Sequence, residues 1–383
     1  PRTSSAASDV YKRQIYESGL NVPLVVRVPE KWKKLSPFKS GYRTSTFVEF
    51  VDLAPTVLSL AGINIPKSID GKPFLGKNLE KVELEKQNTT FAYADRFDEK
   101  YDMVRSIRKG KYKYIRNYQP FNVDGLYNYY RYKMLAYKEW YKLFKEGKLN
   151  TIQSQFFRPR LPESLYNIEK DPHETKNLAQ DNNYEEILKN LREELNNHLI
   201  KINDLSFIPE PYLLKNGLDD IEDYSNKNKE LIQKLIEVAD LSLHDYDEVS
   251  FKIRDALVDS NPWVRYWGLI VNIIYGKKGI ENKDIIDFIF ENDSENLVRM
   301  RAAEYMLLNN IKISDSKIKS LLKSSKFEAE ANLMLNTLAN IKTKNSNYKL
   351  ELKKDVYPDN WFPPVREENA LVNRRMNYLT ENE

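Results

Sequence analysis

The most constraining feature of the sequence is a repeat in its second half. The segment "DSNPWVRYWGLIVNII", with Val264-Arg265, recurs as "DSENLVRMRAAEYMLL", with Val298-Arg299, so the period is 298 − 264 = 34 positions. A third, degenerate copy, "SSKFEAEANLMLNTLA", follows. This period is that of one helix pair per repeat, and each pair buries its apolar face against the next. We therefore expect residues 229–341 to form an α-solenoid.

Composition and charge exclude several classes of function. The 60 basic and 56 acidic residues nearly cancel to a net charge of +4, and the lysines are interleaved with acids, as in "EKVELEKQN". Nucleic-acid binding needs basic charge gathered on one face, so we expect no nucleic-acid partner. The chain has no cysteine and only three scattered histidines, which excludes disulfides, Cys-ligated zinc and thiol nucleophiles. No apolar run approaches the roughly 20 residues of a membrane-spanning helix.

The N-terminal part opens on an apolar run. Residues 1–14, "PRTSSAASDVYKRQ", look like a translated adapter or a disordered leader, and we exclude them from the fold. Val22 to Val28 then predicts a buried parallel strand whose neighbours are missing. In "VDLAPTVLSLAGI", helical spacing between a capping Asp52 and Gly62 predicts a helix. A strand followed by a helix indicates an α/β layer over residues 15–85.

A second, smaller sheet is expected within residues 86–212. "TTFAYADRF" and "MVRSIRKGKYKYIRNY" read as strands, the latter a hairpin with Lys109-Gly110 at its turn. "SLYNIEKDPHETKNLA" reads as a strand running into a turn, and "NNYEEILKNLREELNNHLIKI" as a long amphipathic helix over the sheet. Residues 213–228 lack apolar periodicity and predict a linker, and residues 342–383 a C-terminal tail.

Four of these segments resemble, in order, parts of the type I sulfatases of the alkaline-phosphatase-like fold. "YESGLNVPLVVRVP" is similar to the strand after the family's catalytic lysine, and "VDLAPTVLSLAGINIPKSIDGKPFLG" to its Asp-Leu-x-Pro-Thr helix and following Asp-Gly turn. "MVRSIRKGKYKYIRNY" and "SLYNIEKDPHETKNLA" resemble the C-terminal subdomain strands, the latter most like heparan N-sulfatases (sulfamidases) and related bacterial sulfatases. Four motifs in the family's order are far more specific than one.

The resemblance, over residues 15 to about 212, implies an α/β fold. The chain would be the C-terminal remnant of such a sulfatase with a small antiparallel-sheet subdomain, followed by an α-helical, HEAT-like repeat domain. In the family the nucleophile is a formylglycine from a Cys/Ser-x-Pro/Ala-x-Arg motif, and calcium is held by Asp and Asn residues mostly upstream of the matched segment. The sequence contains no such motif. We therefore expect a fragment that lacks the catalytic half, holds no metal and is inactive alone.

The reaction itself sets what the missing half must supply. Cleavage of a sulfate ester or sulfamate develops negative charge on the transferred group, so it needs a hard cation and converging basic donors. The resemblance implies a parent enzyme that hydrolyses sulfate esters or sulfamates of glycans, with calcium as cofactor, and a periplasmic or secreted location. The alternative is a binding or scaffold module, in which the concave face of the helical repeats holds a protein or polymeric partner and the sulfatase-like part is a support.

Three residues are candidate site residues. Lys12 stands four positions before Tyr16, where the family places a sulfate-contacting lysine; the alternative is an accidental match inside the adapter-like leader. Arg96 and Asp98 lie at the end of a predicted strand, where loops of α/β enzymes commonly meet substrate. Arg96 would suit a second anionic group on a sugar, and Asp98 sugar hydroxyls. The alternative for both is a solvated charged turn.

Other chemically suggestive residues have structural interpretations. His173 lies in a turn opened by Asp171-Pro172, where Glu174 and Asn177 can bond to backbone groups. A run of tyrosines could stack on sugar rings, but packing between helix and sheet is the simpler interpretation; the run comprises Tyr127, Tyr129, Tyr130 and Tyr132. Arg265 and Arg299 are most simply explained by contacts between neighbouring repeats.

Overall fold

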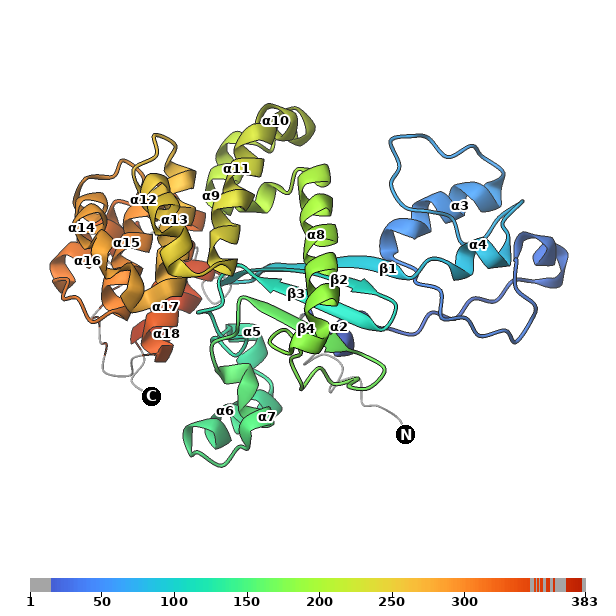
Figure 1. Cartoon of the computed structure of the whole chain (residues 1–383), viewed down its shortest axis with the longest axis horizontal. Helices are drawn as coiled ribbons and strands as arrows, with labels where there is room; N and C mark the ends of the chain where they lie inside the picture. Colours follow the sequence, from blue (N-terminus) through green and yellow to red (C-terminus); the bar gives the residue numbers. More distant parts are fainter. Residues whose placement is uncertain are drawn as a thin grey trace. The chain divides into compact units, whose positions relative to one another are not determined.

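The chain is mostly helical, with one small antiparallel sheet (Figure 1). The computed structural model describes residues 15–344, 348, 350, 352–353, 356–358, 361 and 370–380. These fall into two compact units. Unit 1 holds the described residues up to 93, with 105–115 and 164–195; unit 2 holds 94–104, 116–163 and the described residues from 196 onward. Every strand of the sheet is shared between the two.

The four strands lie in the order β1-β2-β3-β4. They are β1 (Thr89–Phe97), β2 (Lys100–Lys109), β3 (Tyr112–Asn117) and β4 (Glu163–Asn167). Gly110 lies at the predicted β2–β3 turn with φ 55°, a left-handed conformation that glycine adopts without steric cost. The Ile168 and Asn117 backbone N–H groups donate to the Lys111 and Pro162 carbonyls, both at 2.8 Å, which makes β3 and β4 antiparallel. The predicted strands of this sheet are therefore confirmed.

The helices before and beside the sheet are short, apart from one. They are α2 (Glu17–Leu20), α3 (Leu53–Ala61), α4 (Lys81–Glu85), α5 (Tyr129–Tyr132), α6 (Leu135–Lys145), α7 (Thr151–Ser154) and α8 (Glu185–Ile202). The helix predicted before Gly62 is confirmed as α3, which ends on Gly62 in the left-handed conformation. Asp52 does not cap it, because its carboxylate accepts from the Glu49 and Lys72 backbone N–H groups instead. The long helix predicted after residue 181 is confirmed as α8.

The predicted strand from Val22 to Val28 is wrong, and with it the α/β layer over residues 15–85. Residues 21–29 have no regular structure, and no strand occurs anywhere in 15–85, all of which is described. Val25 is 91% exposed, so the run is not buried either. A central strand needs partners on both edges for its backbone N–H and C=O groups, and no strand in the described part of the chain offers them.

A buried ion cluster ties the start of the described chain to the sheet within unit 1. The Lys113 side chain, on β3, is 1% exposed and lies 3.2 Å from Glu17 Oε1 and 3.0 Å from Glu174 Oε1. The Glu17 backbone N–H also donates to Glu174 Oε2 at 2.6 Å, and Arg108 pairs with the Glu17 carboxylate. Burial raises the pKa of Glu174, although Lys113 opposes that shift.

The repeat period corresponds to stacked helix pairs in unit 2. The helices of this region are α9 (Glu210–Asn216), α10 (Ile221–Lys227), α11 (Lys229–Asp240), α12 (Tyr246–Leu257), α13 (Pro262–Tyr275), α14 (Lys283–Asn292), α15 (Asn296–Leu308), α16 (Asp315–Lys323) and α17 (Glu328–Lys344). Helices α11, α13, α15 and α17 pack in one row, and α12, α14 and α16 pack beside them. Helices α13 and α15 begin 296 − 262 = 34 positions apart, as the sequence period predicts.

Aspartates at equivalent positions of the two clearest repeats make the same hydrogen bond. Asp259 and Asp293 each accept from the backbone N–H two residues on, at 2.8 and 2.9 Å. Arg265 donates two hydrogen bonds, of 2.7 and 3.0 Å, to the Asp293 carboxylate of the next repeat. The predicted contact of Arg265 between neighbouring repeats is therefore confirmed. Arg299 instead donates to the Phe290 carbonyl of its own helix pair. Assignment to the HEAT class, and the domain boundaries at 213–228 and 341, stay predictions; helices α9 and α10 fall in or across the predicted linker.

The last helix, α18 (Leu371–Thr380), packs against α17 within unit 2. Its Arg375 is completely buried and donates to the Glu99 carbonyl at 3.0 Å, the Tyr127 carbonyl at 2.7 Å and Asn336 Oδ1 at 2.8 Å. Tyr378 stacks on Tyr127 with ring centroids 4.3 Å apart. Part of the predicted tail is therefore core structure. No helix in the described ranges combines the length and the apolar character that membrane crossing requires.

We expect the chain to bind hydrophobic dyes, because unit 1 exposes many large apolar side chains. Val25, Phe50 and Val57 are 91%, 86% and 64% exposed. Exposed apolar surface promotes association. The double variant Val25→Ser/Phe50→Ser should lower the fluorescence of 8-anilinonaphthalene sulfonate and shift size-exclusion profiles toward monomer, with little change in melting temperature. A wild-type chain that is dye-silent and monodisperse would contradict this.

We also expect Lys344 to make stability depend on pH in the alkaline range. Burial lowers the pKa of Lys344 from 10.5 to about 8, with Glu304 opposing the shift. Below pH 8 the charged ammonium is present in both states and its burial destabilises the fold. Between pH 8 and 10.5 the folded state loses the proton first, so this cost disappears as pH rises.

Lys344→Met should therefore raise the free energy of unfolding at pH 7, by about 1 kcal/mol since the side chain keeps some solvent contact. The gain should shrink at pH 10. Urea unfolding at both pH values measures it, with the exposed Lys323→Met as the matched control. A gain that is equal or larger at pH 10 would show that Lys344 is not the cause.

Candidate functional site

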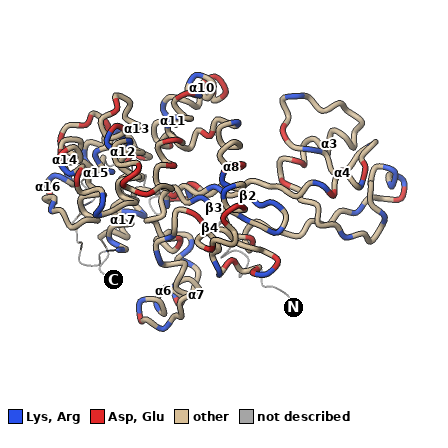
Figure 2. The backbone as a smooth tube through the Cα atoms, in the orientation of Figure 1, with Lys and Arg blue, Asp and Glu red and all other residues tan. Residues whose placement is uncertain are grey.

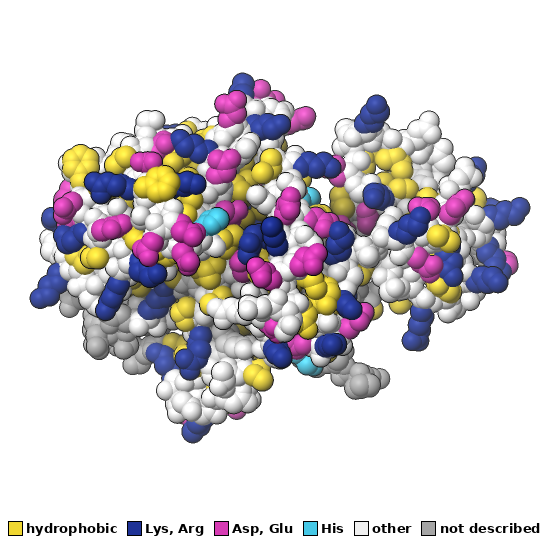
Figure 3. Space-filling model, viewed as in Figure 1, with side chains coloured by type: hydrophobic (Ala, Val, Ile, Leu, Met, Phe, Trp, Pro, Cys, Tyr) yellow, Lys and Arg dark blue, Asp and Glu magenta, His cyan; other side chains and the backbone are white. Residues whose placement is uncertain are grey.

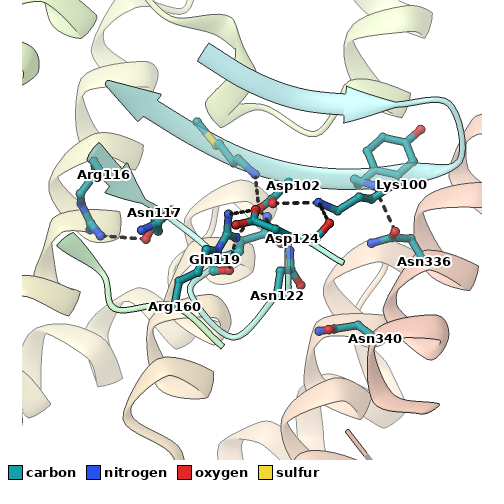
Figure 4. A network of polar contacts seen from close by, with 12 residues as sticks. Lys100, Asp102, Arg116, Asn117, Gln119, Asn122, Asp124, Arg160, Asn336 and Asn340 are labelled. Atoms are coloured by element: carbon teal, nitrogen blue, oxygen red, sulfur yellow. Dashed lines mark hydrogen bonds and ion pairs between the residues drawn. The ribbon is translucent and has the colours of Figure 1, made fainter. Parts of the chain in front are cut away.

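A set of buried and partly buried charged and polar residues in unit 2 lies where β2 begins, and we call it the Asp102 cluster (Figure 4). It consists of Lys100, Asp102, Gln119, Asn122, Asp124 and Arg160. Two members come from β2, three from the loop after β3 and one from the segment before β4. The sheet places these three segments side by side, because β2, β3 and β4 are consecutive neighbours in it.

Arg160 binds both carboxylates of the cluster. Its Nη2 lies 2.8 Å from Asp102 Oδ1 and donates to the Gln119 carbonyl at 3.2 Å, and its Nη1 lies 3.2 Å from Asp124 Oδ1. The Arg160 side chain is 9% exposed and that of Asp102 is 6% exposed. Charges removed from water to this degree stabilise a fold only when they are paired and hydrogen-bonded, as here.

Lys100 approaches the same carboxylate from the other side. Its Nζ lies 3.5 Å from Asp102 Oδ2 and donates to the Asp124 carbonyl at 3.3 Å. Burial lowers the pKa of Lys100, and Asp102 and Asp124 oppose that shift without cancelling it. For Asp102, burial acts to raise the pKa, but Arg160 and Lys100 outweigh it and the pKa is lowered. Arg160 and Lys100 therefore favour the ionised form of the Asp102 carboxyl group, whereas burial disfavours the charged form of Lys100.

The contacts of the Asp102 cluster stabilise the fold of unit 2. Two cations face two carboxylates, and the amide groups bridge them: Asn122 Nδ2 donates to Gln119 Oε1 at 3.2 Å, and Gln119 Oε1 also accepts from Arg301 Nη2 at 3.2 Å. Arg301 belongs to α15, so the cluster ties the loop after β3 to the helix pairs within unit 2. Sequence reasoning missed it because its members are up to 160 − 100 = 60 positions apart.

The predicted substrate residues Arg96 and Asp98 lie together at the β1–β2 turn, in unit 2. Arg96 Nη1 donates to the Asp98 carbonyl at 3.1 Å, and Arg96 Nε lies 2.8 Å from Glu210 Oε1. Asp98 has φ 50°, and its carboxylate is 3.7 Å from Arg374 Nη1. Both side chains keep about a third of their surface exposed, at 38% and 35%. An anionic ligand on Arg96 would compete with Glu210, and the roles of both residues stay predictions.

The remaining candidates divide between described and undescribed positions. Lys12 lies outside the described residues. His173 is exposed, in a turn where Asp171 accepts from the Thr175 and Lys176 backbone N–H groups at 2.7 and 2.8 Å. Of the tyrosine run, Tyr132 is buried and Tyr130 is 52% exposed.

The described residues contain no group of three or more His, Asp or Glu side chains arranged to hold a metal ion. They therefore do not fit the calcium ion that the sulfatase resemblance implies.

Comparison with known proteins identifies relatives. Residues 9–156 match the family model described as "N-sulphoglucosamine sulphohydrolase, C-terminal". An "Ulvan-active sulfatase" of Formosa agariphila is 39% identical over 206 residues, which are 53% of this chain and 33% of that protein. The chain is therefore similar to sulfatases over this part of its length. Human "Arylsulfatase K" is 33% identical over a shorter stretch of 75 residues, 20% of this chain and 13% of that protein.

The relationship covers part of each sulfatase. A second "Ulvan-active sulfatase" of Formosa agariphila is 29% identical over 187 residues, 47% of this chain and 33% of the relative. The chain thus spans about a third of the length of these sulfatases. The match to the family model takes in β1 to β3 and the helices up to α7, whereas Arg160, β4 and the helix pairs follow it.

We expect the two ends of the Asp102 cluster to respond differently to mutation. Asp102→Asn leaves two buried cations without their shared counter-ion and should lower the free energy of unfolding by about 3–5 kcal/mol. Lys100→Met removes a buried ammonium whose pKa is already lowered, keeps the Arg160–Asp102 pair, and should be neutral or stabilising. Urea unfolding followed by circular dichroism measures both. Equal losses in the two variants would contradict the argument.

Proposed function

We propose that this chain is the C-terminal part of a sulfatase that hydrolyses sulfate esters or sulfamates of a sulfated glycan, and that it does not catalyse this reaction alone. The observation that carries the proposal is the sequence similarity: the family model described as "N-sulphoglucosamine sulphohydrolase, C-terminal" matches residues 9–156, and an ulvan-active sulfatase is 39% identical over 206 residues, which are 33% of its length. The proposed location is periplasmic or secreted.

Two features support the catalytic half lying elsewhere. The sequence has no cysteine and no Ser-x-Pro/Ala-x-Arg segment, so it contains no precursor of a formylglycine nucleophile. Unit 1 also exposes apolar side chains on α3 and on the run after α2, including Val25 at 91% and Val57 at 64%. Burial of such groups is the main favourable term in association, so a large apolar partner surface suits them.

Within the proposal, the residues of this chain would form the support and the rim of the site. The calcium ion would be held by residues outside the chain. Arg96 and Asp98, held at the β1–β2 turn, remain the proposed contacts to a sugar's second anionic group and hydroxyls, and Lys12 the proposed sulfate contact. The sequence leaves one alternative function, in which the concave side of the helix pairs binds a protein or polymeric partner.

We expect this chain alone to release no sulfate from an aryl sulfate or from a sulfated disaccharide, measured by ion chromatography. A longer protein read from the DNA upstream of residue 15 should release sulfate from at least one sulfated glycan, and should lose that activity when the Cys or Ser of its Cys/Ser-x-Pro/Ala-x-Arg motif is changed to Ala.

Two outcomes would overturn the proposal. One is turnover by this chain alone that a Lys12→Ala change abolishes, since the reacting group would then lie within it. The other is an upstream reading frame that encodes no such motif and releases no sulfate.

A further inference from the structure

One segment of unit 2 around α6 is markedly basic. Residues 129–158, which we call the basic lobe, contain seven Lys and Arg and two Glu, a net charge of 7 − 2 = +5. The whole chain has +4, so everything outside the lobe sums to 4 − 5 = −1. The near-neutral composition of the whole chain therefore conceals a locally basic segment, and Figure 3 shows a few dark blue side chains on the lobe at the bottom of the view.

Nearly all of this charge is at the surface. Arg131 is buried and donates to the Asp124 carbonyl at 2.7 Å, but the other six cations are exposed. They are Lys133, Lys138, Lys142, Lys145, Lys148 and Arg158. Figure 2 shows basic positions along α6 and the loop after it. The acidic partner Glu146 lies 2.7 Å from Lys148 and 3.9 Å from Lys142, whose side chains are 64% and 75% exposed, and such pairs yield easily to a competing anion.

Three of the lysines form a row along α6. Lys138, Lys142 and Lys145 have the spacing i, i+4, i+7, which places them on one side of the helix over about 10 Å of its length. The ring of Tyr141 borders this row and is only partly buried; the Lys145 ammonium lies 5.4 Å from its centroid. A row of cations beside an aromatic ring suits a chain of sugars that carry sulfates at intervals, because the ring can pack on an apolar sugar face while the ammonium groups meet the sulfates.

The lobe is a rigid platform. On the opposite side of α6, Trp140 stacks on Phe156 with centroids 4.7 Å apart and Phe144 stacks on Phe157 at 4.8 Å. Trp140 Nε1 also donates to the Gln153 carbonyl at 3.1 Å, which fixes α6 to α7. Because packing already orders the backbone that carries the lysines, little entropy is lost when a ligand binds them.

We propose that the basic lobe is a binding surface for a sulfated polysaccharide, through Lys138, Lys142 and Lys145 of α6. The choice of a sulfated glycan over other polyanions rests on the proposed function. The three lysines are not members of the Asp102 cluster, whose charged groups pair with one another, so the surface would hold a polymer chain by its sulfates without acting on them.

The test is a binding measurement on the full chain, with dextran sulfate as the probe and neutral dextran as the uncharged control. The wild-type chain should bind dextran sulfate and not dextran, and binding should weaken as salt rises. The variant Lys138→Gln/Lys142→Gln/Lys145→Gln should bind at least about tenfold more weakly. The matched control Lys31→Gln/Lys33→Gln/Lys34→Gln removes the same charge from exposed lysines of unit 1 and should stay within about twofold of wild type.

The outcomes separate this inference from the proposed function. Equal losses in the two triple variants would mean that net charge alone governs binding, and would overturn the lobe as a site, as would unchanged binding in the α6 variant with its circular dichroism intact. Double-stranded DNA bound as tightly as dextran sulfate would overturn the assignment to a sulfated glycan. Because no turnover is measured, failure of the longer protein to release sulfate leaves this result unaffected.

Discussion

The guanidinium group of Arg116 joins three segments of unit 2 that are far apart in sequence. It is 2% exposed, and it donates to the Pro162 carbonyl at 3.3 Å, the Ala239 carbonyl at 3.0 Å and Asp240 Oδ1 at 3.1 Å. A further bond of 2.7 Å reaches Ser242 Oγ. The end of β3, the segment that enters β4 and the first helix pair are therefore fixed by one side chain. Only the planar fork of arginine offers this many donors at once, so lysine could not replace it.

Local patterns predicted local structure well. The strand patterns of β1 to β4, the Lys109-Gly110 turn and the 34-position period all depend on residues close in sequence, and the structure shows each of them. The strand predicted from Val22 to Val28 was also inferred from local composition alone, and this prediction is wrong. Its composition is that of a buried strand, but a strand is defined by its neighbours, and composition says nothing about whether those neighbours are present.

Sequence reasoning could not find contacts between distant residues, because these contacts form only when the chain folds. The local sequence at the end of β1 points to Arg96 and Asp98. Their charged partners, Glu210 for Arg96 and Arg374 for Asp98, lie more than a hundred positions away in the sequence. The Asp102 cluster has no local signature for the same reason. The basic lobe was missed for another reason. The net charge of the whole chain adds the +5 of these 30 residues to the −1 of all other residues, so the sum does not reveal a local basic segment.

The burial of Arg375 bears on the order of events during synthesis. Its donors reach the carbonyl of Glu99, which precedes it by 276 positions, and Asn336 at the centre of α17. Until residue 375 has emerged from the ribosome, those buried acceptors have no partner from this helix. Contacts between such distant positions are slow to form because a long loop must close first. Unit 2 can therefore reach its native packing only after residue 375 has been synthesised, because these contacts join segments around positions 99, 336 and 375.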